Sequence, residues 1–193
     1  MKKGLLIILS GPSGVGKGTI RRKVMEDNDL NLAYSISVTT RAPRPSEKNG
    51  IDYFFVSDKE FDEDLAKGNF LEHAEFVGNR YGTPKDFVEK LRNEGKNVFL
   101  EIEVSGATQI MENYVGNDLV TIFLIPPSYD ELRARICGRH SECEEIISAR
   151  LAKAKREMKM KYRYQYIVLN DDIARASEEI KSIIRNKINA VII

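Results

Sequence analysis

The stretch Leu5–Thr19 reads LLIILSGPSGVGKGT, in which five apolar residues precede a glycine-rich segment and a lysine. The apolar run is typical of a buried strand, and the residues after Lys17 are compatible with a helix. Between them, Gly11–Lys17 matches G-x-x-x-x-G-K, in which glycines let backbone N–H groups converge on one point. The positive end of the helix and the Lys17 ammonium complete an anion cradle. The sequence therefore predicts a phosphate-binding loop between a strand and a helix.

One residue departs from the usual form of this loop. Gly18 stands where the pattern ordinarily has the Ser or Thr that ligates Mg²⁺, and Thr19 follows one place later. Because Mg²⁺ dehydrates reluctantly, we expect it to be held mainly by substrate phosphates and water. The direct protein ligands stay open, with Thr19 as a candidate.

Length and composition restrict the class of protein. The chain has 193 residues, 42% hydrophobic and 31% charged, which fits a compact globular domain rather than a disordered or fibrous chain. Its net charge of +1 argues against a dedicated nucleic-acid binder. We therefore expect neither nucleic acid nor membrane as a partner. Monomer and homo-oligomer both stay open.

The N-terminus and the cysteines suggest a compartment. Met1–Leu9 imitates the start of a signal peptide, but its apolar run is shorter than a signal-peptide core and leads straight into the glycine-rich loop. No stretch approaches the 18 apolar residues of a membrane span, and two cysteines cannot build a disulfide framework. These features predict a cytoplasmic protein.

Alternating apolar and amphipathic segments predict the architecture. Strands are expected at 5–9, 98–102, 119–125 and 167–169, and helices at about 19–26, 86–93, 129–138, 142–160 and 171–189. This order indicates an α/β fold with a parallel sheet covered by helices on both faces, as in P-loop NTPases. Residues 33–84 break the rhythm with a Pro- and Arg-rich turn, aromatic runs and an acidic helix. We expect them to form a small mixed α/β insertion.

Opposite charges gather in two segments. Residues 57–75 carry seven acidic and two basic side chains, whereas residues 132–161 carry nine basic and four acidic ones. Charge runs of this kind are commonly solvated helix faces. Near a phosphate site, however, the basic segment could also act on the substrate.

Several longer motifs follow the loop in a fixed order. They are Ser35–Arg44 (SISVTTRAPR), Asn49–Phe55 (NGIDYFF), Phe70–Ala74 (FLEHA), Gly78–Pro84 (GNRYGTP), Leu100–Ala107 (LEIEVSGA), Pro126–Ser128 (PPS) and Asn170–Asp172 (NDD). Over essentially its whole length, the chain resembles guanylate kinase, the ATP-dependent kinase of GMP. The resemblance implies that ATP and GMP are converted to ADP and GDP, with dGMP as a further expected acceptor, in purine nucleotide metabolism and GMP recycling.

The resemblance also implies the nucleotide-binding residues. It assigns ATP to Gly11, Pro12, Ser13, Gly14, Val15, Gly16, Lys17, Gly18, Thr19 and Asn170. It assigns the GMP phosphate to Arg41, Arg44, Tyr53 and Tyr81. It places around guanine Ser37, Glu72, Thr83 and one of Glu101 or Glu103.

The chemistry of guanine agrees with this division. Guanine presents N1–H and its 2-amino group side by side, so one ionised carboxylate such as Glu72 can accept both. Adenine has an unprotonated N1 that would face the carboxylate, which leaves two buried acceptors opposed. Guanidinium forks and tyrosine hydroxyls suit phosphate oxygens. Glu103 stands where the family usually has aspartate, so its role stays open.

The basic segment corresponds to the family's mobile lid. The resemblance implies that Arg135, Arg139 and Arg150 cover the transferring phosphoryl group and act with Lys17 as the catalytic residues, with Mg²⁺ accompanying ATP. Phosphoryl transfer relies on positioning and charge stabilisation, and GMP supplies its own nucleophilic oxygen. The expected single domain thus has a core at 1–32, 85–136 and 151–193, a GMP-binding insertion at about 33–84 and a lid at about 137–150.

Some alternatives remain on sequence grounds. Asn170 suits either adenine contact or a helix N-cap. Cys137, His140 and Cys143 have no evident fourth ligand, so separate packing is favoured over zinc. The chain could also be a kinase for another small phosphate acceptor, or a non-catalytic module that binds phosphopeptides. Retention of Lys17 and the lid arginines argues against the module.

Overall fold

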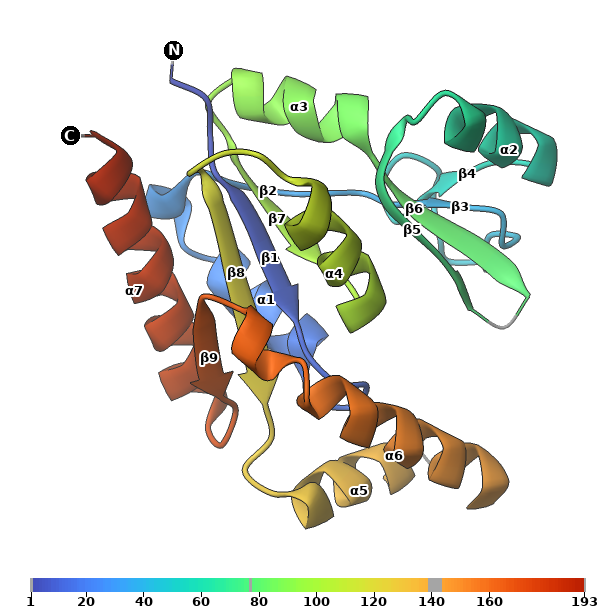
Figure 1. Ribbon diagram of the computed structural model, residues 1–193, viewed down its shortest axis with the longest axis vertical. Coiled ribbons are helices and arrows are strands. Elements are labelled where there is room, and N and C mark those ends of the chain that lie inside the picture. Colours follow the sequence, from blue (N-terminus) through green and yellow to red (C-terminus); the bar gives the residue numbers. More distant parts are fainter. Residues whose placement is uncertain (1, 77, 139–143, 193) are drawn as a thin grey trace.

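The core of the molecule is a five-stranded parallel sheet, seen in a computed structural model that describes residues 2–76, 78–138 and 144–192 (Figure 1). The strand order is β2-β7-β1-β8-β9, and every neighbouring pair is parallel. The strands are β2 (Leu32–Tyr34), β7 (Asn97–Glu101), β1 (Leu6–Ser10), β8 (Leu119–Ile125) and β9 (Tyr166–Leu169). The predicted fold class is confirmed.

Strand β1 lies at the centre of this sheet because its side chains are apolar on both faces. Ile7 and Leu9 point into one cluster, and Leu6 and Ile8 point into the other. All five residues of the strand are buried. Full burial on both faces is what a continuous apolar run without alternation indicates.

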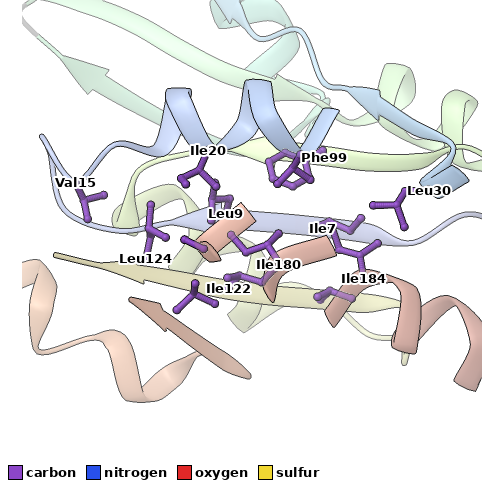
Figure 2. Packing of buried hydrophobic residues seen from close by; sticks show 14 of the residues in the cluster. Ile7, Leu9, Val15, Ile20, Leu30, Phe99, Ile122, Leu124, Ile180 and Ile184 are labelled. Atoms are coloured by element: carbon purple, nitrogen blue, oxygen red, sulfur yellow. The ribbon is translucent and has the colours of Figure 1, made fainter. Parts of the chain in front are cut away.

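Helices cover both faces of the sheet. On one face α1 (Lys17–Met25) and α7 (Ile173–Ile192) contribute Ile20, Ile180 and Ile184 to the cluster shown in Figure 2. On the other face α3 (Lys85–Asn93) and α4 (Val104–Asn113) contribute Val88 and Ile110. No helix in the described part of the chain is long and apolar enough to cross a membrane.

A second, smaller sheet stands beside the core and has the order β4-β3-β6-β5. Its strands are β3 (Val38–Thr39), β4 (Phe54–Phe55), β5 (Phe70–Phe76) and β6 (Asn79–Pro84). The acidic segment forms α2 (Asp58–Ala66), which begins with a capping box between Ser57 and Glu60. This sheet and helix lie within residues 33–84, although Ala33 and Tyr34 pair with β7 in the core sheet.

Two further helices lie beyond the carboxyl ends of the strands (Figure 1). They are α5 (Tyr129–Cys137) and α6 (Glu144–Met158), with short 3₁₀ turns at Asn28–Leu30 and Lys161–Arg163. Leu132, Ile136, Leu151 and Ala154 anchor the pair to the apolar cluster of the core. The basic segment is therefore held at the edge of the sheet where the phosphate loop lies.

Among the strands and α-helices of the core, the sequence prediction omitted two, β2 and α4. Helix α4 has a weak local signal because its first turn contains Val104 and Gly106 and its N-cap makes no side-chain hydrogen bond. Strand β2 spans three half-buried residues and is too short for a periodic pattern. Helix α7 also begins at Ile173 rather than Asp171, because the side chain of Asp172 accepts from the Arg175 N–H and caps it.

A fully buried arginine joins the N-terminus, α3 and the segment before β8. Arg92 donates from Nε to the Gly4 carbonyl at 2.9 Å and from Nη1 to Glu89 at 2.7 Å. Its Nη2 donates to the Tyr114 hydroxyl at 2.8 Å and also to Asp118. Burial opposes ionisation of Asp118, but the Tyr114 hydrogen bond and the Arg92 charge hold the pKa of that carboxyl below its ordinary value.

We expect Arg92→Met to lower the free energy of unfolding by about 2–3 kcal/mol, because it leaves carboxylates and a carbonyl without their donor. The side chains of Glu89 and Asp118 are 27% and 26% exposed, so water limits the loss. Urea denaturation at neutral pH measures the effect. Lys3→Met is the control, because it removes only a more exposed ion pair to Glu89. Equal losses in the two variants would contradict the prediction.

Candidate active site

The loop after β1 has the backbone of an anion cradle. Gly11 and Gly16 have φ values of 148° and 102°, which favour glycine. A Cβ at Gly16 would also lie 2.6 Å from Nδ2 of Asn170, so a side chain has no room there. Helix α1 begins at the next residue, and its positive end faces the loop.

Lys17 is folded over this loop. Its Nζ donates to the carbonyls of Gly11 at 2.7 Å and Pro12 at 3.2 Å. Burial lowers the pKa of Lys17, while the charges of Glu101 and Glu157 oppose the shift. A cavity of about 360 Å³ adjoins the ammonium and is lined among others by Ser13, Thr19 and Glu103.

The basic segment reaches the same loop. Arg135 of α5 donates to the carbonyls of Val15 at 3.3 Å and Asn170 at 3.2 Å. Arg150 of α6 donates to the Ser13 hydroxyl at 3.0 Å. The structure thus brings two of the three predicted lid arginines together at the loop. Arg139 lies outside the described residues, as do His140 and Cys143 of the cysteine–histidine group.

Asn170 holds the loop from the opposite end of the chain. Its buried side chain donates from Nδ2 to the Val15 carbonyl at 2.7 Å. Because Asp172 caps α7, the N-cap interpretation of Asn170 was wrong. A further cavity beside the loop is lined by Gly16, Thr19, Arg135, Asn170, Asp171, Asp172 and Ile173.

Gly18 and Thr19 lie at the mouth of the loop cavity. A Cβ at Gly18 would lie 3.4 Å from Oε1 of Glu101, so this carboxylate faces the position that usually holds Ser or Thr. Thr19 is exposed, and its hydroxyl accepts from Arg22 at 3.4 Å. Glu101 itself pairs with Arg21 at 2.9 Å. Hydroxyl and carboxylate oxygens, the kind of ligand that Mg²⁺ prefers, therefore line this part of the cavity.

A second pocket of about 320 Å³ lies between the two sheets. Its lining residues are Tyr34, Ser37, Asp52, Tyr53, Glu72, Ala74, Tyr81, Glu101, Ile102 and Glu103. Glu72 is only 7% exposed, and its Oε1 accepts from the Thr83 hydroxyl at 2.6 Å. Burial raises the pKa of Glu72, the Thr83 hydrogen bond opposes this, and the charge of Glu103 adds to it. The pairing of β5 with β6 places Glu72 opposite Thr83.

Glu47 organises two arginines close to Tyr53, which lines this pocket. Arg41 donates from Nη2 to both Glu47 oxygens at 2.8 and 2.9 Å, and the Arg44 backbone N–H donates to Glu47 at 2.8 Å. The Arg41 guanidinium lies 5.4 Å from the Tyr53 ring centroid, and the Tyr53 and Tyr81 rings are 6.1 Å apart. Arg41, Tyr53 and Tyr81 are thus grouped, whereas the Arg44 side chain is 73% exposed.

Sequence reasoning missed several residues in and around this site. Four of them are Arg21, Tyr34, Glu47 and Lys153. Arg21 lies 4.1 Å over the Tyr34 ring, and Lys153 of α6 pairs with Glu103 at 2.7 Å. A signal exists for Arg21, which lies one helical turn after Lys17, and for Glu47, which follows Arg44 by three residues in a turn. Lys153 is brought to Glu103 only by tertiary packing.

A phosphate loop after the central strand of a parallel sheet, facing a pocket on a smaller sheet, defines a P-loop nucleotide-binding protein. The sequence model described as guanylate kinase matches residues 3–187. The chain belongs to the guanylate kinase family, and it is a nucleoside monophosphate kinase. The resemblance drawn from the sequence motifs is therefore confirmed.

Individual relatives agree over nearly the whole chain. The guanylate kinase of Malacoplasma penetrans is 51% identical over 187 residues, which are 97% of this chain and 95% of that protein. The guanylate kinase of Bacillus anthracis is 53% identical over 183 residues, or 95% and 88%. The crystal structure of guanylate kinase from Anaplasma phagocytophilum has a TM-score of 0.75 and 36% identity, covering 97% and 87% of the two chains.

Proposed function

We propose that this chain phosphorylates GMP with ATP and that the two cavities described above hold the two substrates. The chain is an ATP-dependent GMP kinase by family. One observation carries the assignment of the substrates. The two cavities share three lining residues, which are Glu101, Ile102 and Glu103. Two nucleotides bound there would lie on either side of one shared wall at the end of β7. In-line transfer needs the two substrates to be adjacent in this way.

We assign guanine to the inner end of the second pocket. The buried Glu72 carboxylate can accept from N1–H and the 2-amino group, while Thr83 and Ser37 offer hydroxyls. Glu101 is already paired with Arg21, and Glu103 is paired with Lys153. Either carboxylate can contribute the second acidic group implied by the family. None of these assigned groups reads the ribose 2′-hydroxyl, so dGMP is also a proposed substrate.

We assign the GMP phosphate to Arg41, Arg44, Tyr53 and Tyr81. Glu47 holds the Arg41 fork, so phosphate binding exchanges or shares this partner. Arg44 has an exposed side chain that must swing inward to join the clamp. Closure of the small sheet toward the core would bring both changes about.

For the transfer step we assign Lys17, Arg135 and Arg150 to the charge that develops on the phosphoryl group. Arg139, from the same basic segment, completes the proposed set. The acceptor phosphate oxygen of GMP bonds to the γ-phosphorus of ATP as the bond to the bridging oxygen breaks, and ADP leaves with that electron pair. No general base is needed, because the attacking oxygen carries no essential proton.

The family uses ATP generally with Mg²⁺. The loop cavity offers the oxygen ligands that this ion prefers, namely the Thr19 hydroxyl and whichever of the Glu101 and Glu103 carboxylates does not contact guanine. We propose that these residues hold the ion directly or through water. When bound, it would neutralise phosphate charge. For the ATP base we propose the cavity beside Arg135 and Asn170.

The proposed moving parts follow the division expected from the sequence. Residues 33–84 bind GMP, residues 137–150 form a lid, and the remaining chain forms the core of one domain. We place the reaction in the cytoplasm, in purine nucleotide metabolism and GMP recycling. The cysteine content agrees with that compartment.

A panel of acceptors tests the proposal. ADP release from Mg-ATP is measured with GMP, dGMP, AMP, UMP and CMP supplied separately, and each product is identified by chromatography. We expect GDP and dGDP to form at least about 10³-fold faster than any non-guanine diphosphate, because adenine leaves buried acceptors unmet. Equal rates with AMP would support a kinase of another acceptor. No transfer by a folded protein that binds Mg-ATP would support a non-catalytic module.

A further inference from the structure

A helical glycine lies against the carboxylate that we assign to guanine. Gly106 is in the first turn of α4, and a Cβ at this position would lie 2.2 Å from Oε2 and 2.8 Å from Cδ of Glu72. Both residues are buried. Glycine is unfavourable inside a helix, so helix propensity does not account for its presence here. The Glu72 carboxylate occupies the space in which a side chain at position 106 would lie.

The distance between α4 and β5 is fixed by a second set of contacts. The Gln109 side chain accepts from the His73 N–H at 3.1 Å and donates to the His73 carbonyl at 2.8 Å. His73 directly follows Glu72, so this two-way bond holds the helix against the strand. On its other side, Glu72 accepts from Thr83 at 2.6 Å. The carboxylate is thus confined between the Thr83 hydroxyl and the backbone of α4.

We propose that Gly106 is a positioning residue for base specificity, which gives the Glu72 carboxylate the one placement from which it can accept both guanine donors. The proposal rests on the role of Glu72 given above. Gly106 has no side chain with which to contact a substrate. It acts through Glu72, while Gln109 keeps the helix from moving away to accommodate a larger residue.

A methyl group at position 106 would force the carboxylate or the helix to shift. A misplacement of about 1 Å costs up to about 10²-fold in rate. For Gly106→Ala we therefore expect the KM for GMP to rise about 10- to 100-fold, with loss of discrimination against AMP. The KM for ATP should change less than about threefold, because the phosphate loop lies outside this contact.

The experiment compares Gly106→Ala with Ser105→Ala, its exposed neighbour on the same helical turn. Steady-state kinetics for GMP, AMP and ATP and the melting temperature are measured for each. A GMP KM for Gly106→Ala within about threefold of the control overturns the proposal. A failure of the function proposed above is seen separately, as wild-type protein without guanine selectivity.

A second variant separates the proposed contact from general damage. In Glu72→Asp the side chain is one methylene shorter, so the carboxylate leaves room for the methyl group that the Gly106→Ala substitution adds. We expect Gly106→Ala to lower the melting temperature of the wild-type protein and to leave that of the Glu72→Asp protein unchanged or higher. Equal losses in both backgrounds, or failure of both proteins to fold, overturn the proposal. If Gly106→Ala fails to fold in the wild-type background but Glu72→Asp/Gly106→Ala folds, the proposal is supported.

Discussion

Lys17→Ala is expected to lower kcat by about 10²- to 10³-fold, the loss typical of removing one preorganised charge from a transition state. The ammonium lies over the loop on two backbone carbonyls and can move from them to the outer phosphates. Its charge then stabilises the phosphoryl group as it leaves ATP. Because Lys17 lines the loop cavity and not the base pocket, the KM for GMP should change less than about threefold.

Single-turnover kinetics with saturating Mg-ATP and GMP measures this effect on the chemical step. Lys23→Ala is the matched control, because it removes an exposed lysine of the same helix that pairs with Glu26. ATP binding by calorimetry checks that the variant loop still holds nucleotide. A Lys17→Ala kcat within about threefold of the control would exclude the assigned role.

Glu72→Gln is expected to raise the KM for GMP by about 10²-fold and to make the protein more stable. The amide NH₂ would face the guanine donors, so one accepted hydrogen bond becomes a donor–donor contact. Burial raises the pKa of Glu72. The stability contributed by this group is therefore present below its unfolded-state pKa and is lost as pH rises toward the folded-state value. Glutamine carries no charge, so the variant should melt at a higher temperature at neutral pH.

The same shift predicts a pH dependence of GMP binding. As pH falls through the raised pKa of Glu72, the carboxyl takes up a proton and can no longer accept both guanine donors. The KM for GMP should therefore rise at a pH above that at which an ordinary glutamate titrates. Glu72→Gln should lack this component. Since the GMP phosphate titrates equally in both proteins, the difference between their profiles isolates Glu72.

Steady-state kinetics and thermal melts between about pH 5 and 8 test both expectations. Glu75→Gln is the control, since Glu75 is exposed on the same strand. Wild-type guanine selectivity in Glu72→Gln would remove Glu72 from the base site. A lower melting temperature would show instead that the ionised carboxylate stabilises the folded protein.

Local sequence patterns were enough to predict the core but not the contacts that tune the site. The apolar run of β1 and the glycine loop after it carry their structure within a short stretch of chain, so both were foreseen. The pairing of Glu72 with Thr83 depends on the register of β5 and β6, which no local pattern gives. The family resemblance predicted both residues, but it did not predict the hydrogen bond between them.

Contacts absent from the motifs were missed for the same reason. Glu47 holds Arg41 through a turn, and Lys153 reaches Glu103 across 50 residues of chain. Helix α4 was missed because glycine and a β-branched residue open it. The glycine that hides the helix from prediction is the residue that makes room for Glu72. Helix propensity fails to predict α4 because the site requires a glycine in the first turn of this helix.

The hydrogen bonds to the Val15 carbonyl join parts of the chain that the ribosome makes at different times. This carbonyl accepts from Arg135 and Asn170, which lie 120 and 155 residues later in the chain. Translation makes the N-terminal loop first, yet its two anchors emerge among the last third of the residues. A nascent or truncated chain lacking them should bind nucleotide weakly. We therefore expect nucleotide binding to require a chain translated at least as far as Asn170, and a shorter chain should consume little ATP.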